Sequence, residues 1–123
     1  MADPRHLRGI AAEAAVARCL EQGGWLILAR RWRCASGELD LVCREPTGVL
    51  VGVEVRLRRD GRAGSALESV TPRHLRRLRA TLAAYAAEHP GPRRGVRLDL
   101  VAVRPAPRPG HWIVRRVPSV DGW

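Results

Sequence analysis

The 123-residue sequence predicts an α/β fold, with a mixed central sheet of about five strands flanked by helices in the order α-β-β-β-α-β-β. Three observations carry this prediction. Apolar residues recur at helical spacing in the first 22 residues and again after Thr71. Two short apolar runs on either side of Pro46-Thr47-Gly48 have the pattern of a β-hairpin. Two further apolar runs follow the second helix, so the chain alternates between the two kinds of structure.

The N-terminal half begins with a helix expected at His6–Gln22, followed by a natural end at Gly23-Gly24, since glycine readily adopts the left-handed cap conformation. A short strand is expected at Trp25–Ala29. The hairpin then occupies Glu38–Arg44 and Val49–Leu57. Both faces of these two strands are largely apolar, which predicts a central position in the sheet or helices on both sides.

The C-terminal half begins with a polar segment, residues 58–70, that is expected to be a loop. Thr71-Pro72 is a helix-start signal, with threonine as the cap and proline at the first helical position, and this helix is expected to end near Glu88. Strands are expected at Val96–Val103 and Trp112–Val117. No repeat or long linker divides the chain, so residues 1–123 are expected to form one domain.

Acidic residues on the apolar hairpin are the most informative feature of the sequence. If the hairpin folds about Thr47, Asp40 lies opposite Glu54, and Glu38 lies opposite Arg56. Because strand side chains alternate in direction, these four side chains would share one face. A bulge at a glycine of the turn or second strand would shift this register by one residue.

Two facing carboxylates repel each other unless a positive charge lies between them. One interpretation is that Asp40 and Glu54 are bound to interior arginines. The other is that they share a Mg²⁺ or Mn²⁺ ion, since these hard ions prefer carboxylate oxygens. Glu13 is either a solvated helix residue or an acid brought to the hairpin by the close packing of its alanine-rich helix. Arg56 either contacts a phosphate or neutralises Glu38.

The net charge of +10 comes with 22 arginines and no lysine. Compositional bias explains the choice of arginine, whereas the excess of basic residues favours a polyanionic partner, most simply nucleic acid, although solubility alone could maintain it. The candidate contacts follow the hairpin and line one side of the second helix; the alternative is that they are solvated surface charges. They are Arg58, Arg59, Arg62, Arg73, Arg76 and Arg77.

Other residues indicate little chemistry. The three cysteines lack zinc-site spacing and are expected to be reduced. The four histidines show no spacing typical of a metal or nucleophile site, and Trp32 and Trp112 are expected to pack in the core rather than stack on bases. No apolar run is long enough to span a bilayer and no signal peptide is recognisable, so a cytoplasmic protein without a membrane partner is expected.

Four segments occur in a recognisable order: Gly9-x-x-Ala12-Glu13, Gly37-Glu38-Leu39-Asp40-Leu41, Val53-Glu54-Val55-Arg56 and Arg97-Leu98-Asp99. In these segments the chain resembles the YraN-like family of small uncharacterised bacterial proteins. That family looks like a compact member of the restriction-endonuclease-like superfamily, similar to archaeal Holliday-junction resolvases. The resemblance covers about Leu7 to Val103.

The resemblance implies a nuclease-type site in which Asp40 and Glu54 bind metal and Glu13 supplies a further acid. Position 56 matches the lysine of the superfamily signature, and here the sequence departs, because it has Arg56. Arginine keeps the positive charge and can hold a phosphate, but it stays protonated and so cannot act as a base. Activity would therefore survive if the lysine's role is electrostatic and fall sharply if it transfers a proton.

Three hypotheses follow. The first is a metal-dependent nuclease acting on nucleic acid, with structured or branched DNA as the expected substrate. The second is a non-catalytic nucleic-acid-binding protein of the same fold, inactivated or weakened by Arg56. The third is a structural protein whose acids are locked into ion pairs. The resemblance also makes a homodimer a reasonable expectation.

Overall fold

The computed structural model describes residues 4–58 and 63–120. Its elements, in chain order, are α1 Pro4–Gln22, β1 Leu26–Cys34, β2 Gly37–Arg44, β3 Leu50–Leu57, α2 Ala63–Glu68, α3 Pro72–Glu88, β4 Val96–Pro105 and β5 Trp112–Val117. The five strands form one sheet in the order β1-β2-β3-β4-β5. Only β3 and β4 are parallel among these neighbours, and the other pairs are antiparallel. The predicted α/β class, the mixed sheet and the central position of the hairpin are confirmed.

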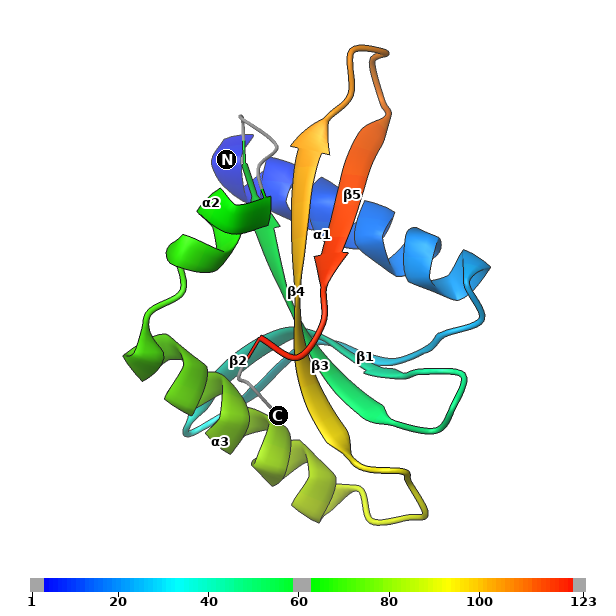
Figure 1. The fold of residues 1–123 in the computed structure, drawn as a ribbon, viewed down its shortest axis with the longest axis vertical. Coiled ribbons are helices and arrows are strands. Elements are labelled where there is room, and N and C mark those ends of the chain that lie inside the picture. The colour runs from blue at the N-terminus through cyan, green and yellow to red at the C-terminus, as the bar shows by residue number, and fades with distance from the viewer. Residues whose placement is uncertain (1–3, 59–62, 121–123) are drawn as a thin grey trace.

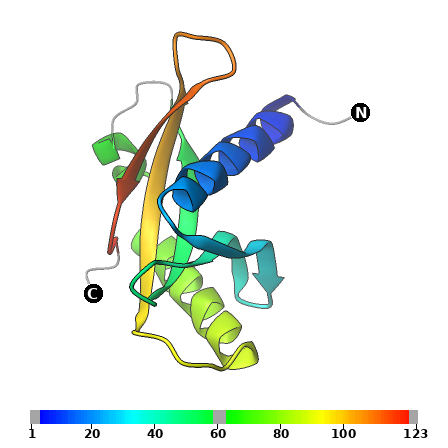
Figure 2. The same ribbon diagram turned by 90° about the vertical axis from the view of Figure 1, so that its right-hand side faces the viewer.

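Helices cover both faces of the sheet (Figure 1 and Figure 2). On one face α1 contributes Ala12 and Val16 to a core with Val53 of β3. On the other face α3 packs Leu78 and Leu82 against the sheet, and α2 lies beside it over β4 and β5. Successive residues of β3 therefore face different helices, and Glu54 points to the side of α3.

The start of α3 is confirmed residue by residue. The Thr71 hydroxyl accepts a hydrogen bond from the backbone N–H of His74 at 3.1 Å, and Pro72 is the first helical residue. The expected apolar stripe is present, with Leu78, Leu82 and Tyr85 buried. The cap thus fixes which residues of the first turn face the sheet.

Two predictions of local structure were wrong. Residues 58–70 were expected to be a loop, but Ala63–Glu68 is a helix. Six residues are too few to show helical periodicity, and α2 is held by packing, since Ala66 is fully buried against Leu100 and Ala102. The strand expected at Trp25–Ala29 instead runs from Leu26 to Cys34, because backbone pairing with β2 carries it through its arginines.

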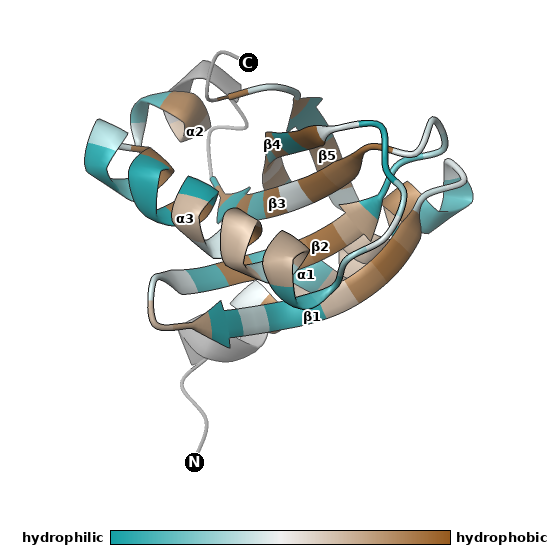
Figure 3. Ribbon diagram, turned by 90° about the horizontal axis from the view of Figure 1, so that it is seen from below, coloured by the Kyte–Doolittle hydropathy of each residue, from teal (hydrophilic) through white to brown (hydrophobic). Residues whose placement is uncertain are grey.

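The predicted hairpin register is confirmed. Leu41 pairs with Val53 and Arg44 with Leu50, which corresponds to a fold about Thr47 with no shift between them. The irregularity in this part of the sheet lies in β1, between Ile27 and Ala29. Figure 3 shows the hydrophilic ends of β1 and β3 on the same side of the molecule as the hydrophilic first turns of α3. Within the described ranges, no helix is long and apolar enough to cross a membrane.

Candidate functional site

The site forms where β2 and β3 part. Their last paired residues are Leu41 and Val53, so Asp40 and Glu54 lie immediately beyond the ladder. There the Asp40 carboxylate replaces a strand partner, because its Oδ2 accepts the backbone N–H of Val55 at 2.7 Å. Both acids line a cavity of about 430 Å³ that lies between the hairpin, α1 and α3. The two candidate metal ligands therefore meet in one cavity.

Asp40 has an unusual charge state for an aspartate. Burial raises its pKa to about 8, and a hydrogen bond to Glu54 and the negative charge of Glu54 add to the effect. The Val55 N–H opposes the shift but is the weaker influence. At pH 7 Asp40 is therefore protonated, because nearby positive charge does not offset its burial and the charge of Glu54.

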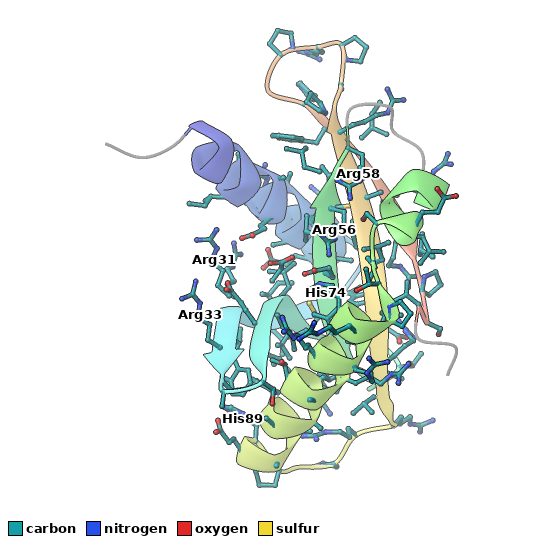
Figure 4. All side chains as sticks on the ribbon, turned by 90° about the vertical axis from the view of Figure 1, so that its left-hand side faces the viewer. Arg31, Arg33, Arg56, Arg58, His74 and His89 are labelled. Atoms are coloured by element: carbon teal, nitrogen blue, oxygen red, sulfur yellow. The ribbon has the colours of Figure 1, made fainter. Side chains whose placement is uncertain are left out.

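Glu54 is held by two basic side chains. It is 11% exposed, and its Oε2 lies 3.2 Å from Nη2 of Arg56 and 2.6 Å from Nε2 of His74 (Figure 4). The Glu54 carboxylate favours an imidazolium. Burial and the charges of Arg56 and Arg77 nevertheless lower the pKa of His74, so the ring is neutral at pH 7. A neutral ring satisfies this contact by carrying its proton on Nε2, so that the Nε2–H group donates a hydrogen bond to Glu54.

Sequence reasoning missed His74, to which it gave no role. The only signal was its position, three residues after the cap Thr71, where the first turn of α3 faces the sheet. That position becomes informative only once the packing of α3 against β3 is known. The role of His74 can therefore be recognised from the tertiary structure but not from a sequence motif.

Glu13 reaches the same cavity from α1. Its side chain is 18% exposed, so it is not a solvated helix residue, and its Oε2 accepts a hydrogen bond from Nε of Arg31 at 3.0 Å. Burial raises the pKa of Glu13, the Arg31 hydrogen bond opposes this, and the charge of Asp40 raises it further. Glu13 is thus close enough to Asp40 to sense its charge.

Arg31 is a second residue that the sequence did not reveal. Its φ of 51° lies in the left-handed region, which costs a non-glycine residue about 1–3 kcal/mol. The conformation places its guanidinium on Glu13 and at the cavity wall. A strained backbone at a cavity of acids is a feature that often accompanies function.

The expected contact between Glu38 and Arg56 is not present. Glu38 instead binds Arg33 across β1 and β2, with Nε of Arg33 2.9 Å from Oε2 of Glu38. Arg56 pairs with Glu54 on its own strand. The hairpin parts beyond Asp40, which separates the position of Glu38 from that of Arg56.

The proposed nucleic-acid contacts lie at different distances from the cavity. Arg77 lines the cavity together with Arg31 and Arg33. Arg73 and Arg76 are exposed on α3. Arg58 follows β3 and donates from Nη1 to the carbonyl of Leu57 at 3.1 Å. Arg59 and Arg62 lie outside the described residues.

The donor set fits a hard divalent cation. Over residues 4–58 and 63–120 no group of three or more His, Cys, Asp or Glu side chains is arranged to hold a metal ion. Mg²⁺ needs no such cage, since one or two carboxylates, water and substrate phosphate usually bind it. Asp40 and Glu54 are two such carboxylates, and a cation would displace the proton of Asp40.

The backbone conformation and close packing at position 37, the first residue of the hairpin motif, explain why it is glycine. Its φ is 147°, a conformation that other residues rarely adopt, and an added Cβ would lie 3.2 Å from Oγ1 of Thr81. The hairpin thereby lies close to α3 at the cavity wall. Gly37 therefore positions Asp40 relative to the helix that carries His74.

A second buried acid, Asp99 of β4, lies on the opposite face of the sheet. Its neighbours Val101 and Val103 pack in the core under α1. Asp99 is fully buried and accepts two hydrogen bonds from Arg97, at 2.8 and 3.0 Å. It accepts further bonds from Arg116 and the backbone N–H of Ser119, each at 3.0 Å. All of this charge is compensated inside the protein.

Comparison with known proteins identifies a family of similar sequences. A family model described as "Uncharacterised protein family UPF0102" matches residues 12–103. The chain belongs to this family. A UPF0102 protein of Kineococcus radiotolerans is 46% identical over 112 residues, which cover 89% of this chain and 88% of that protein. A UPF0102 protein of Ralstonia nicotianae is 44% identical over 98 residues, which cover 77% of this chain and 75% of that protein.

A UPF0102 protein of Deinococcus radiodurans is 57% identical over 68 residues, 55% of each chain. The UPF0102 match runs from α1 into β4. It therefore includes every element that contributes an acid to the cavity, as well as Asp99. The resemblance to the YraN-like family expected from the four segments is confirmed.

Proposed function

We propose that the protein is a nuclease that depends on Mg²⁺ or Mn²⁺ and hydrolyses phosphodiester bonds in nucleic acid, with structured or branched DNA as the first substrate to test. The observation that supports this best is the pair of Asp40 and Glu54. The charge of buried Glu54 acts on half-buried Asp40 and raises its pKa, and a divalent ion held by both acids would offset this repulsion.

In this proposal Asp40 and Glu54 hold the ion, and Glu13 completes or orients its shell. The bound ion would supply Lewis acidity and an activated water for phosphodiester cleavage. His74 and Arg56 hold one oxygen of Glu54, which fixes the orientation of its carboxylate. Outer contacts of this kind commonly tune a metal site.

Arg56 is the candidate for stabilising the phosphate. Its Nε is buried and has no hydrogen-bond partner among the described residues. A buried donor without a partner costs free energy, so a phosphate oxygen at this position would remove that cost. Because arginine remains protonated at working pH, its role is electrostatic and not that of a base.

The first test is metal binding. Mn²⁺ is titrated calorimetrically into the wild-type protein, Asp40→Asn, Glu54→Gln and a control, Glu88→Gln, which removes an exposed acid at the end of α3. Binding is expected for the wild type and the control, and not for the two site variants. Equal binding by all four proteins would remove the metal from the proposal.

The second test is cleavage. Labelled single-stranded, duplex and branched DNA are incubated with pure protein and Mn²⁺, and products are separated by size. Cleavage is expected for the wild type and Glu88→Gln, and loss of cleavage for Glu54→Gln. Activity that survives in Glu54→Gln would come from a contaminant or another site.

A second candidate function is a nucleic-acid-binding protein without turnover. Arg56, at the position that matches the lysine of the superfamily signature, is the observation that favours it. Arg56→Lys separates the two functions. A large gain in cleavage shows an enzyme that arginine limits, and binding by both proteins without cleavage by either supports the binding protein. If the wild type cleaves and Arg56→Lys cleaves at the same rate, the role proposed for position 56 is wrong.

A further inference from the structure

A second cavity, of about 230 Å³, lies at the other end of α3. Tyr85 and His89 of α3 form one wall, and Leu28 of β1 and Arg44 of β2 form another. A more open hollow adjoins it, shares Arg44 with it and adds Arg94. The two hollows together form a groove around the end of the β2–β3 hairpin, far along α3 from His74.

The groove carries uncompensated positive charge. Arg44 and Arg94 are exposed, and neither forms an ion pair with an acid of the described residues. The nearest acid in sequence, Glu45, is already engaged by Arg97 at 3.1 Å and by the hydroxyl of Thr47 at 2.6 Å. Arg93 adds a third charge, and it donates to carbonyls at the end of α3. An anion would therefore meet three arginines here.

The same groove also offers an exposed aromatic ring, that of His89, with the buried Tyr85 behind it. The rings of Tyr85 and His89 are stacked, with centroids 4.0 Å apart and planes at 14°. Trp32 meets both rings edge-on, which fixes their position. Exposed Leu28 extends the apolar surface on the side of β1. Arginines beside a rigid aromatic surface suit a ligand with both phosphates and bases.

The two cavities lie along the same side of α3. Arg77, Leu78 and Thr81 line the acid cavity, and Tyr85 and His89 line the second one, at the spacing of three or four residues that places them on one helical face. Arg77 and His89 are twelve positions apart, which corresponds to about 18 Å along a helix.

We propose that the groove of Arg44, His89 and Arg94 is a second subsite for a single strand of nucleic acid whose scissile phosphate lies in the acid cavity. The inference rests on the proposed function and specifies its substrate. The strand is single because bases stack on protein rings only when they are free of their complementary strand. A free phosphate would use the arginines but not the aromatic wall.

The test compares double variants that remove equal charge. Arg44→Ala with Arg94→Ala alters the groove, and Arg18→Ala with Arg108→Ala removes two exposed arginines from α1 and the β4–β5 connection. Binding to labelled dT12 and dT4 is measured by fluorescence anisotropy in EDTA, at several salt concentrations. The same proteins are assayed for cleavage of a single strand with Mn²⁺.

The groove variant is expected to bind dT12 about tenfold more weakly than the control variant, and the slope of log K against log salt should fall by about 1.4. Binding of dT4, which is long enough to occupy the groove alone, should also be weaker for the groove variant than for the control variant. Equal weakening of dT12 binding in both variants, or no binding of dT12 by the wild type, overturns the subsite.

The outcomes separate this inference from the proposed function. Cleavage by the wild type with equal dT12 binding by both variants removes the subsite and leaves the nuclease. Weaker dT12 binding by the groove variant, without cleavage by any protein, retains the subsite and removes the nuclease. Equally strong binding of duplex and single strand would overturn the single-strand preference.

Discussion

Two clusters of acids lie on opposite faces of the same sheet, one around fully buried Asp99 and the other formed by half-buried Asp40 and buried Glu54, and they differ in how their charge is compensated. Asp99 accepts four hydrogen bonds, three of them from guanidinium groups. Asp40 accepts one backbone hydrogen bond and faces another acid, and its pKa is raised to about 8. Both are acids on apolar strands, so residue type alone does not distinguish them.

The difference indicates what each cluster does. The Asp99 cluster is complete without a ligand, since Arg97 also binds Glu45 and both Arg97 and Arg116 lie over the ring of Trp25. It joins β4 to the segment after β5, because Ser119 donates to Asp99. Ion pairs of this kind were the third sequence hypothesis for the acids of the hairpin, and they are found most fully at Asp99. The charge of the Asp40 cluster is less fully compensated, and such a cluster in a cavity is a candidate ligand site.

The largest expected effect is at Asp99. Asp99→Ala would remove a fully buried carboxylate that accepts four hydrogen bonds and would leave the N–H of Ser119 without its acceptor, which costs about 3 kcal/mol of unfolding free energy. Urea unfolding measures the loss, and Glu88→Ala, at an exposed acid, should cost less than about 0.5 kcal/mol. If the two variants unfold alike, the Asp99 cluster is not the structural one.

The second effect is that of metal on stability. Mn²⁺ at one hundred times its Kd should stabilise the wild type at pH 8 by about 2.7 kcal/mol, because only the folded state brings Asp40 and Glu54 together. Thermal unfolding with and without Mn²⁺ measures this shift. Asp40→Asn should show no shift, while Glu88→Gln should match the wild type. A shift that persists in Asp40→Asn would place the metal elsewhere.

The smallest of the three expected effects is the dependence of stability on pH. The pKa of Asp40 is about 8 in the folded protein and near 3.8 when unfolded, so between these values the folded state binds the additional proton. Stability should therefore fall as pH rises from about 4 to about 8. Asp40→Asn removes this dependence and should be more stable than the wild type at pH 9 by about 1–2 kcal/mol.

Urea unfolding at pH 5, 7 and 9 measures this dependence, with Glu88→Gln as the matched loss of one acid. A wild-type slope that Asp40→Asn leaves unchanged would show that Asp40 is ionised at neutral pH. In that case the two acid clusters would be alike in charge compensation, and the contrast between them would no longer support a ligand.

The sequence predicts those features that depend on local rules. The turn at Thr47 determines the hairpin register, and strand alternation then places Asp40 beside Glu54. Thr71-Pro72 determines where α3 begins. These features depend on neighbouring residues, so a short pattern is sufficient to find them.

Features that depend on how elements pack were not predictable in this way. His74 enters the site because α3 lies against β3, and Arg31 enters it through a left-handed conformation that no residue pattern signals. The pairing of Glu38 with Arg33, in place of Arg56, follows from the parting of β2 and β3. Compensation of the charge of Asp99 likewise requires Arg116 of β5, a strand that is remote in sequence.

The parting of β2 and β3 also limits how a cation could be coordinated. It turns Oδ2 of Asp40 toward the Val55 N–H, while Oε2 of Glu54 faces Arg56 and His74. Each carboxylate therefore keeps one oxygen outside these contacts, and these are the oxygens with which the two acids would hold a cation. An ion that retains most of its water, such as Mg²⁺, would suit two such oxygens, whereas Ca²⁺ requires six to eight ligands.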